Sequence, residues 1–218
     1  MGKIIAILFI FTATFSFSQS PTQSLEIHDN IISAGYGFPY LPSITFSEYI
    51  NEPEFKSKTT GPYYLKLEHI FSDDISFGIN LAYAANKGSY FEKINQYNST
   101  TGSTSNVSYL HQIDRETFSV LFRANWYFAN DRNFYAYFGG GLGYRYVKWT
   151  ITSTNPSYEN ETYPNYFPFG LEMTIGAKYL FSDIIAVYGE LGFAKSPIQI
   201  GICLILGSEE PEDRKIRR

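Results

Sequence analysis

The sequence is poor in cysteine, in charge and in long apolar runs. Cys203 is the one cysteine among 218 residues, which excludes an intramolecular disulfide framework. Charged residues make up 17% of the chain, against a usual share of about 25%, and 17 basic with 21 acidic residues leave a net charge of -4. No basic excess is present, so no nucleic-acid partner is expected. The longest apolar stretch beyond the N-terminus, 198–206, is interrupted by Gln199 and is shorter than the about 20 residues of a membrane-spanning helix.

Motifs of common site chemistries are also missing. His28, His69 and His111 are scattered and show no metal-ligand spacing, so no metal is expected. The glycine cluster 139–143 lacks the spacing of a phosphate-binding loop and the lysine that follows it. No nucleophile elbow of the form G-x-S-x-G occurs. We therefore expect no cofactor and no enzymatic activity.

The first 18 residues have the pattern of a secretory signal peptide. Lys3 supplies a positive charge, 4–11 form an apolar core, and Ser16 and Ser18 place small residues before a cleavage site. The pattern predicts export, with a mature chain beginning at about Gln19 and a short periplasmic segment over 19–29.

Aromatic residues, in contrast to charges, are abundant, with 19 Tyr and 19 Phe. Most lie in segments where large apolar residues alternate with small or polar ones, which is the period of a half-buried strand. Helical periodicity is not evident. The alternation predicts eight strands, over 30–38, 63–71, 75–86, 117–128, 134–149, 167–181, 184–194 and 197–206.

The two faces of these predicted strands differ in charge. The large apolar face carries no Asp, Glu, Lys or Arg in its central portion, whereas the small face carries several. A charge facing mid-bilayer lipid would cost about 2–4 kcal/mol, while a charge inside a barrel can pair or reach water. We therefore place the small face inside a barrel, where a polar network is predicted from Lys66, Glu68, Arg123, Arg145, Glu172, Lys178 and Glu190.

The predicted connections alternate in length along the chain. Tight turns alternate with long polar segments, as in a transmembrane barrel with short periplasmic turns and long extracellular loops. Aromatic girdles are expected at both ends of the strands, with Trp126, Tyr127 and Phe128 among the members at the turn end. The long loops are predicted over 40–62, 87–108 and 150–165, and the tight turns over 72–74, 129–133 and 182–183.

Two segments carry a resemblance to a known family. The run YAYFGGGLGY over 135–144, and YGELGF over 188–193 leading into IQIG over 198–201, resemble the small eight-stranded outer-membrane β-barrels of the OmpA and OmpX type, in a porin-like form. The likeness spans about 30–206. One feature departs from that family, because the chain continues past Leu206 into a charged tail instead of ending on an aromatic residue.

The fold class expected from pattern and resemblance is all-β, a transmembrane eight-stranded antiparallel up-and-down barrel over 30–207, followed by a charged tail over 208–218. The resemblance implies a monomer in the outer membrane of a Gram-negative bacterium. Its partners would be outer-membrane lipid and an extracellular ligand or cell-surface partner bound through the long loops. The implied role is structural, adhesive or in surface interaction, with at most a narrow channel.

Two alternatives of other classes stay open. A secreted lipocalin-like barrel would bind a small apolar ligand inside, but it would need an apolar interior and a charged exterior. The second alternative is a barrel enzyme that modifies lipids.

Within the lumen, two contacts are predicted. Arg145 and Glu172 are expected to form a cross-strand pair, and Lys66, Arg123 and Glu190 are expected to meet near mid-barrel. Such pairing would close the lumen to ions.

Overall fold

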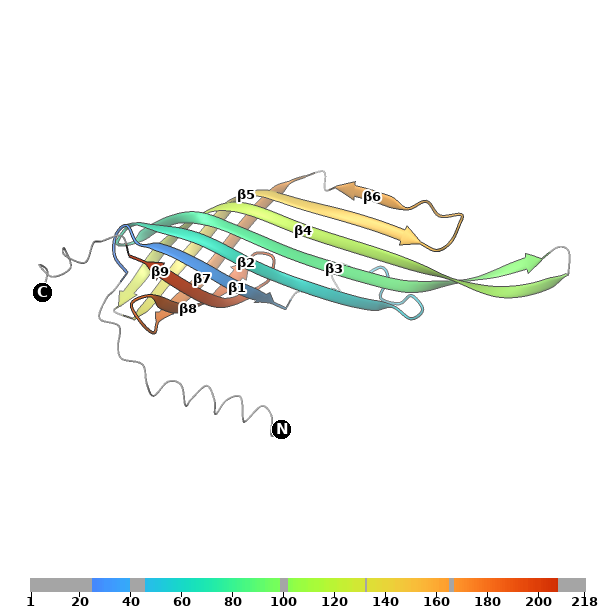
Figure 1. Cartoon of the computed structure of the whole chain (residues 1–218), viewed down its shortest axis with the longest axis horizontal. Helices are drawn as coiled ribbons and strands as arrows, with labels where there is room; N and C mark the ends of the chain where they lie inside the picture. Colours follow the sequence, from blue (N-terminus) through green and yellow to red (C-terminus); the bar gives the residue numbers. More distant parts are fainter. Residues whose placement is uncertain (1–24, 40–45, 99–101, 132, 165–166, 208–218) are drawn as a thin grey trace, which may run out of the picture.

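The computed structural model describes residues 25–39, 46–98, 102–131, 133–164 and 167–207, and these form an antiparallel β-barrel (Figure 1). No helix among the described residues is long and apolar enough to cross a membrane. The predicted signal peptide, 1–18, and the charged tail, 208–218, lie outside the described residues. The strands are β1 (Asn30–Phe38), β2 (Lys56–Ser72), β3 (Ile75–Asn98), β4 (Ser103–Asp131), β5 (Phe134–Ser153), β6 (Glu161–Pro164), β7 (Phe169–Leu180), β8 (Ile185–Phe193) and β9 (Ile198–Leu206).

Eight of these strands close into a ring. Each pairs antiparallel with its neighbours in the order β1-β2-β3-β4-β5-β7-β8-β9, and β9 pairs back onto β1 from Asn30↔Leu206 to Phe38↔Ile198. The short β6 lies outside this ring and pairs with the far end of β5. The expected all-β, eight-stranded up-and-down architecture is confirmed.

The exterior of the ring is apolar. On β4 the outward residues from Phe118 to Phe128, and on β5 those from Phe134 to Tyr146, include no charged side chain, and the register pair Glu116↔Lys148 lies beyond them. Outward side chains such as Phe122, which is 60% exposed although its ring stacks on Phe77, face away from the barrel. This belt suits acyl chains and not water, and the barrel is therefore a transmembrane barrel of the outer-membrane type.

The predicted aromatic girdle needs one correction. Trp126 and Phe128 are exposed near the turn end of β4, as expected, but Tyr127 between them is 3% exposed and faces the lumen. Side chains alternate across a strand, so three consecutive residues cannot share one face.

The prediction of three long irregular loops is wrong for most of their length. Residues 87–98 continue β3, residues 103–108 begin β4, and residues 56–62 belong to β2. β2 stays paired with β3 past a bulge between Thr60 and Tyr63, so backbone pairing continues where the hydrophobic alternation ends. Only 46–55, Gly102 and 154–160 lie outside strands among the described parts of these segments.

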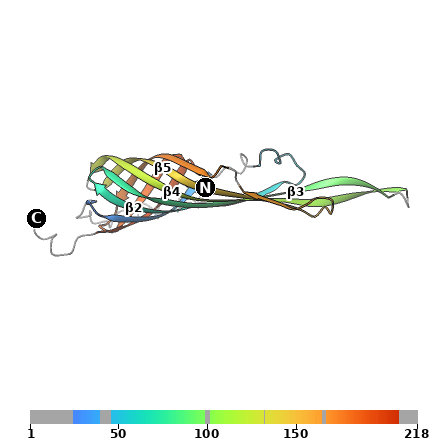
Figure 2. The same cartoon turned by 90° about the horizontal axis from the view of Figure 1, so that it is seen from above.

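The outer ends of β3 and β4 form a two-stranded ribbon, which we define as Glu92–Asn98 and Ser103–Tyr109. These residues pair with one another, from Glu92↔Tyr109 to Asn98↔Ser103. Pairing of β3 with β2 ends at Ser89, and pairing of β4 with β5 ends at His111. The ribbon therefore projects well beyond the barrel, as both views show (Figures 1 and 2).

Candidate functional site: the polar lumen

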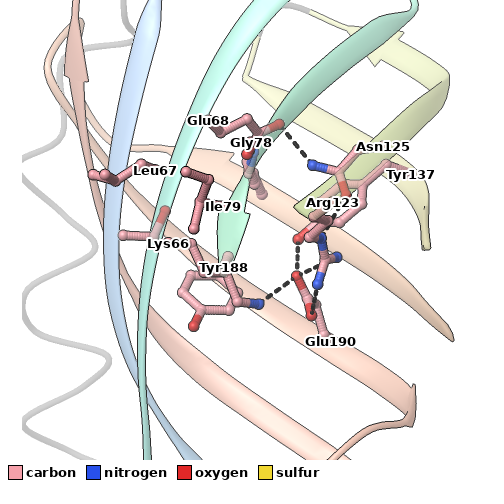
Figure 3. Close-up of a pocket in the computed structure, with 12 residues that line it drawn as sticks. Lys66, Leu67, Glu68, Gly78, Ile79, Arg123, Asn125, Tyr137, Tyr188 and Glu190 are labelled. Atoms are coloured by element: carbon pink, nitrogen blue, oxygen red, sulfur yellow. Dashed lines mark hydrogen bonds and ion pairs between the residues drawn. The ribbon is translucent and has the colours of Figure 1, made fainter. Parts of the chain in front are cut away.

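Six charged side chains meet inside the barrel. Three are basic and three acidic, and each is at most 8% exposed. They come from β2, β4, β7 and β8, so only ring closure brings them together. Figure 3 labels four of them, Lys66, Glu68, Arg123 and Glu190. The six are Lys66, Glu68, Arg123, Glu172, Lys178 and Glu190.

Glu190 is the centre of one half of this network. Lys66 Nζ lies 2.8 Å from its carboxylate, and Arg123 donates to the same carboxylate at 2.9 Å. The Tyr137 hydroxyl donates a further hydrogen bond at 2.7 Å. A buried carboxylate that accepts from two cations and a phenol is compensated in charge and in hydrogen bonding, which is the condition for burying it at all.

Glu68 is the centre of the other half. Lys178 and the Tyr127 hydroxyl both donate to it, and the Asn125 amide donates at 2.9 Å. The ammonium of Lys178 also lies 5.0 Å from the centre of the Tyr137 ring. Tyr137 therefore contacts both halves of the network.

Arg123 contacts two carboxylates, those of Glu172 and Glu190, because glycines on β5 leave space for the side chains. Arg123, Gly141 and Glu172 are register neighbours across β4, β5 and β7, and the guanidinium reaches Glu172 at 2.9 Å. A Cβ on Gly141 would lie 2.7 Å from Cγ of Glu172, and one on Gly139 would lie 2.1 Å from Arg123. The glycine cluster therefore provides the space for side chains from neighbouring strands.

The partner predicted for Glu172 is wrong. Its two carboxylate oxygens accept from Asn80 at 2.7 Å and from Arg123 at 2.9 Å. Arg145 lies four residues further along β5 than Gly141, the register partner of Glu172, and lines a separate cavity nearer the ribbon. The sequence does not show how far neighbouring strands are staggered in the barrel. Because of this stagger, Arg145 and Glu172 do not lie opposite each other, and the predicted pair does not form. Lys66, Arg123 and Glu190 do come together.

Uncharged members of the network were not singled out from the sequence. Asn80, Asn125, Tyr127, Tyr137 and Thr174 all bond to the buried charges. The sequence pattern could have indicated them, because they lie on the strand face that carries the small and polar residues. Polar residues on that face are buried once the barrel closes, and buried polar groups are hydrogen-bonded.

The arrangement is a packed polar core. The free volume among the network side chains is about 10 Å³, close to the minimum that holds one water molecule. In the part of the chain that the structure describes, no group of three His, Cys, Asp or Glu side chains is placed to hold a metal ion. The geometry serves to fill and neutralise the lumen.

No family model and no curated protein matches the sequence. Among solved structures, the barrel is similar to Ail, the attachment invasion locus protein of Yersinia pestis, at 14% identity and a TM-score of 0.42, over 83% of this chain and 96% of that one. It is also similar to the N-terminal β-barrel domain of Pseudomonas aeruginosa OprF, at 14% identity and a TM-score of 0.37, over 84% of this chain and 100% of that one.

Proposed function

We propose that this protein is a non-enzymatic surface-binding protein, in which a closed barrel anchors a projecting β-ribbon that binds an extracellular partner. The single observation that carries the proposal is the ribbon, whose strands pair with one another, while no other strand among the described residues pairs with their outer edges. Its base is fixed, because Phe91 N–H donates to Pro53 O and Thr154 N–H donates to Leu110 O, each at 3.0 Å.

The open edges are chemically suited to strand addition. An unpaired edge presents a row of N–H and C=O groups, and most proteins protect such edges with charges, proline or bulges. Glu92 and Lys93, both next to the base, are the only charged residues of the ribbon, and it contains no proline. An extended segment of a partner could therefore pair along either edge.

The ribbon surface has the composition of an adaptable binding surface. Asn, Ser, Thr, Gln and Tyr make up most of it, and Tyr97 is 66% exposed. Tyrosine supplies contact area at low entropic cost, and short polar side chains supply flexible hydrogen bonding.

The test removes the ribbon and keeps the barrel. Phe91 and Leu110 are register partners, so replacing Glu92–Tyr109 by Asn-Gly closes the hairpin with a two-residue turn and keeps the bonds to Pro53 and Thr154. Cells that display this variant should adhere to surfaces coated with extracellular-matrix proteins, and to one another, no better than cells without the protein. Unheated gel mobility should stay that of a folded barrel.

A matched variant separates the edges from the faces of the ribbon. Ile94 and Val107 are register partners, and replacing both by threonine removes apolar side chains while leaving the edges unchanged. Adhesion should persist in I94T/V107T if backbone pairing binds the partner. Unchanged adhesion after loss of the whole ribbon would refute the proposal.

A further inference from the structure

The lipid-facing surface of the barrel contains a groove that crosses β4, β5, β7, β8 and β9. Its volume is about 420 Å³, within the range of about 300–1,000 Å³ that is typical of small-molecule sites, and it extends from Phe128 on β4 to Ile200 on β9. Glu190 and Gln199 also border it, but they are 2% and 1% exposed because their side chains face the lumen. The side chains that face the groove are therefore apolar.

Small residues form the floor of the groove. Ala136, Ala177 and Gly189 face outward and are register neighbours across β5, β7 and β8. The next outward row toward the outer end of the barrel consists of large residues, which are also register neighbours and form one wall: Ile175, Leu191 and Ile198. The groove exists because a row of small side chains lies beside a row of large ones.

The groove rises through the membrane as it crosses the strands. Phe128 lies three residues before the end of β4, near the turn side, whereas Ile200 lies two residues after the start of β9, near the outer side. Neighbouring strands are about 4.8 Å apart, so the four steps from β4 to β9 cover about 19 Å of the wall. The apolar band of such a barrel is about 25 Å tall and each leaflet fills about half of it, so the groove is long enough for one lipid chain.

We propose that this groove binds one acyl chain of an outer-membrane lipid. The groove is continuous with the apolar belt that faces the bilayer, and no charged or polar side chain faces it to hold a headgroup. Lipid chains are as apolar as the groove, so packing contacts and not the hydrophobic effect favour this position. A chain in the groove contacts floor and wall together, whereas a chain on the flat belt contacts one surface, and the dispersion attraction grows with the number of contacts.

Two outward glycines provide a matched pair of variants. A Cβ on Gly189, in the floor, would meet nothing closer than Gln199 O at 4.0 Å, and a Cβ on Gly140, which does not line the groove, would meet nothing within 4 Å. G189L therefore fills the groove and G140L adds the same side chain elsewhere, both without a backbone clash. A177L fills the floor at a second position. Unheated gel mobility should show that all three variants are folded.

The experiment places the full-length barrel in nanodiscs of diphytanoyl phosphatidylcholine, whose chains are methyl-branched, and replaces this lipid stepwise by dipalmitoyl phosphatidylcholine. Methyl NMR shifts are followed for Ile175, in the groove wall, and for Ile79 on β3, which does not line the groove; they are 45% and 42% exposed. The Ile175 shift should saturate at a low fraction of the linear lipid, whereas the Ile79 shift should change in proportion to that fraction. Saturation should require about tenfold more linear lipid or more in G189L and A177L and should be unchanged in G140L.

A second arm separates the chain from other occupants. Dipalmitoyl phosphatidylglycerol should give the same saturation as the phosphatidylcholine, because the chain and not the headgroup is bound. A response to one headgroup alone, or one that appears only in discs holding two barrels, would overturn the proposal by assigning the groove to a headgroup or to a second copy of the chain. Proportional shifts at both isoleucines, or equal saturation in the wild type and G189L, would also overturn it.

Discussion

β3 and β4 pass through two environments, and their side-chain patterns differ between them. Inside the ring, outward aromatic residues alternate with buried polar ones, as at Phe122 and Arg123. In the ribbon, exposed polar residues occupy both faces, yet the pairing of β3 with β4 continues without a register shift to Asn98↔Ser103. Hydrophobic alternation therefore marks the part of a strand that lies in the membrane, and backbone pairing alone determines how far the strand extends.

The largest loss of stability is expected from replacing Arg123, which lies in the barrel part of β4. Arg123→Met leaves Glu172 and Glu190 buried without their shared cation, which should cost about 3–5 kcal/mol of unfolding free energy. Urea unfolding in phospholipid vesicles, followed by tryptophan fluorescence, measures it. The double variant R123M/E172Q should recover part of the loss, and a loss below about 1 kcal/mol in R123M would show that the lumen is hydrated, not packed.

Two aromatic residues of similar exposure, one in the barrel and one in the ribbon, allow the membrane and aqueous environments to be compared directly. Phe122 in the barrel is 60% exposed and Tyr97 in the ribbon is 66% exposed. Phe122→Arg should destabilise the barrel by about 2–4 kcal/mol because the charge would face lipid, whereas Tyr97→Arg should change stability by about 0.5 kcal/mol or less. The same vesicle assay reports both. Equal effects would contradict the membrane boundary drawn between them.

Glycines on the two faces of β5 give a third comparison. Gly141→Ala places a Cβ 2.7 Å from Glu172 Cγ, and overpacking of this kind costs about 1–3 kcal/mol. Gly140→Ala is the control, because a Cβ there meets nothing within 4 Å. Urea midpoints should separate the two variants. Similar midpoints would mean that the lumen around Gly141 is less tightly packed than the distance to Glu172 indicates.

The smallest effect is expected for an ion pair outside the membrane. Lys93 and Glu54 lie 3.6 Å apart, and both side chains are more than half exposed. Lys93→Met should change the unfolding free energy by less than about 1 kcal/mol, and 0.5 M salt should remove even that difference. A cost comparable with that of R123M would show that the outer segments are coupled to the barrel more strongly than their exposure indicates.

Much of the barrel was predictable residue by residue. The predicted β1, 30–38, agrees with the structure, and the predicted strands over 184–194 and 197–206 differ from β8 and β9 by one residue at each changed end. The charges on the small face of the alternation could also be placed, since a period of two assigns each residue to one face. The ribbon at the outer ends of β3 and β4 was missed because neither of its faces is buried, which leaves the sequence without alternation there.

The sequence by itself determined the strand period, the apolar exterior and the set of charges that face inward, because these depend on local alternation and on the cost of charge in lipid. Only the tertiary structure decided which charges pair. Arg123 reaches Glu172 across Gly141 because the stagger of β4, β5 and β7 aligns these three positions, and Arg145 is displaced toward Lys195 by the same stagger. Register is a property of the closed ring, so the balanced inner network arises only when β9 pairs with β1.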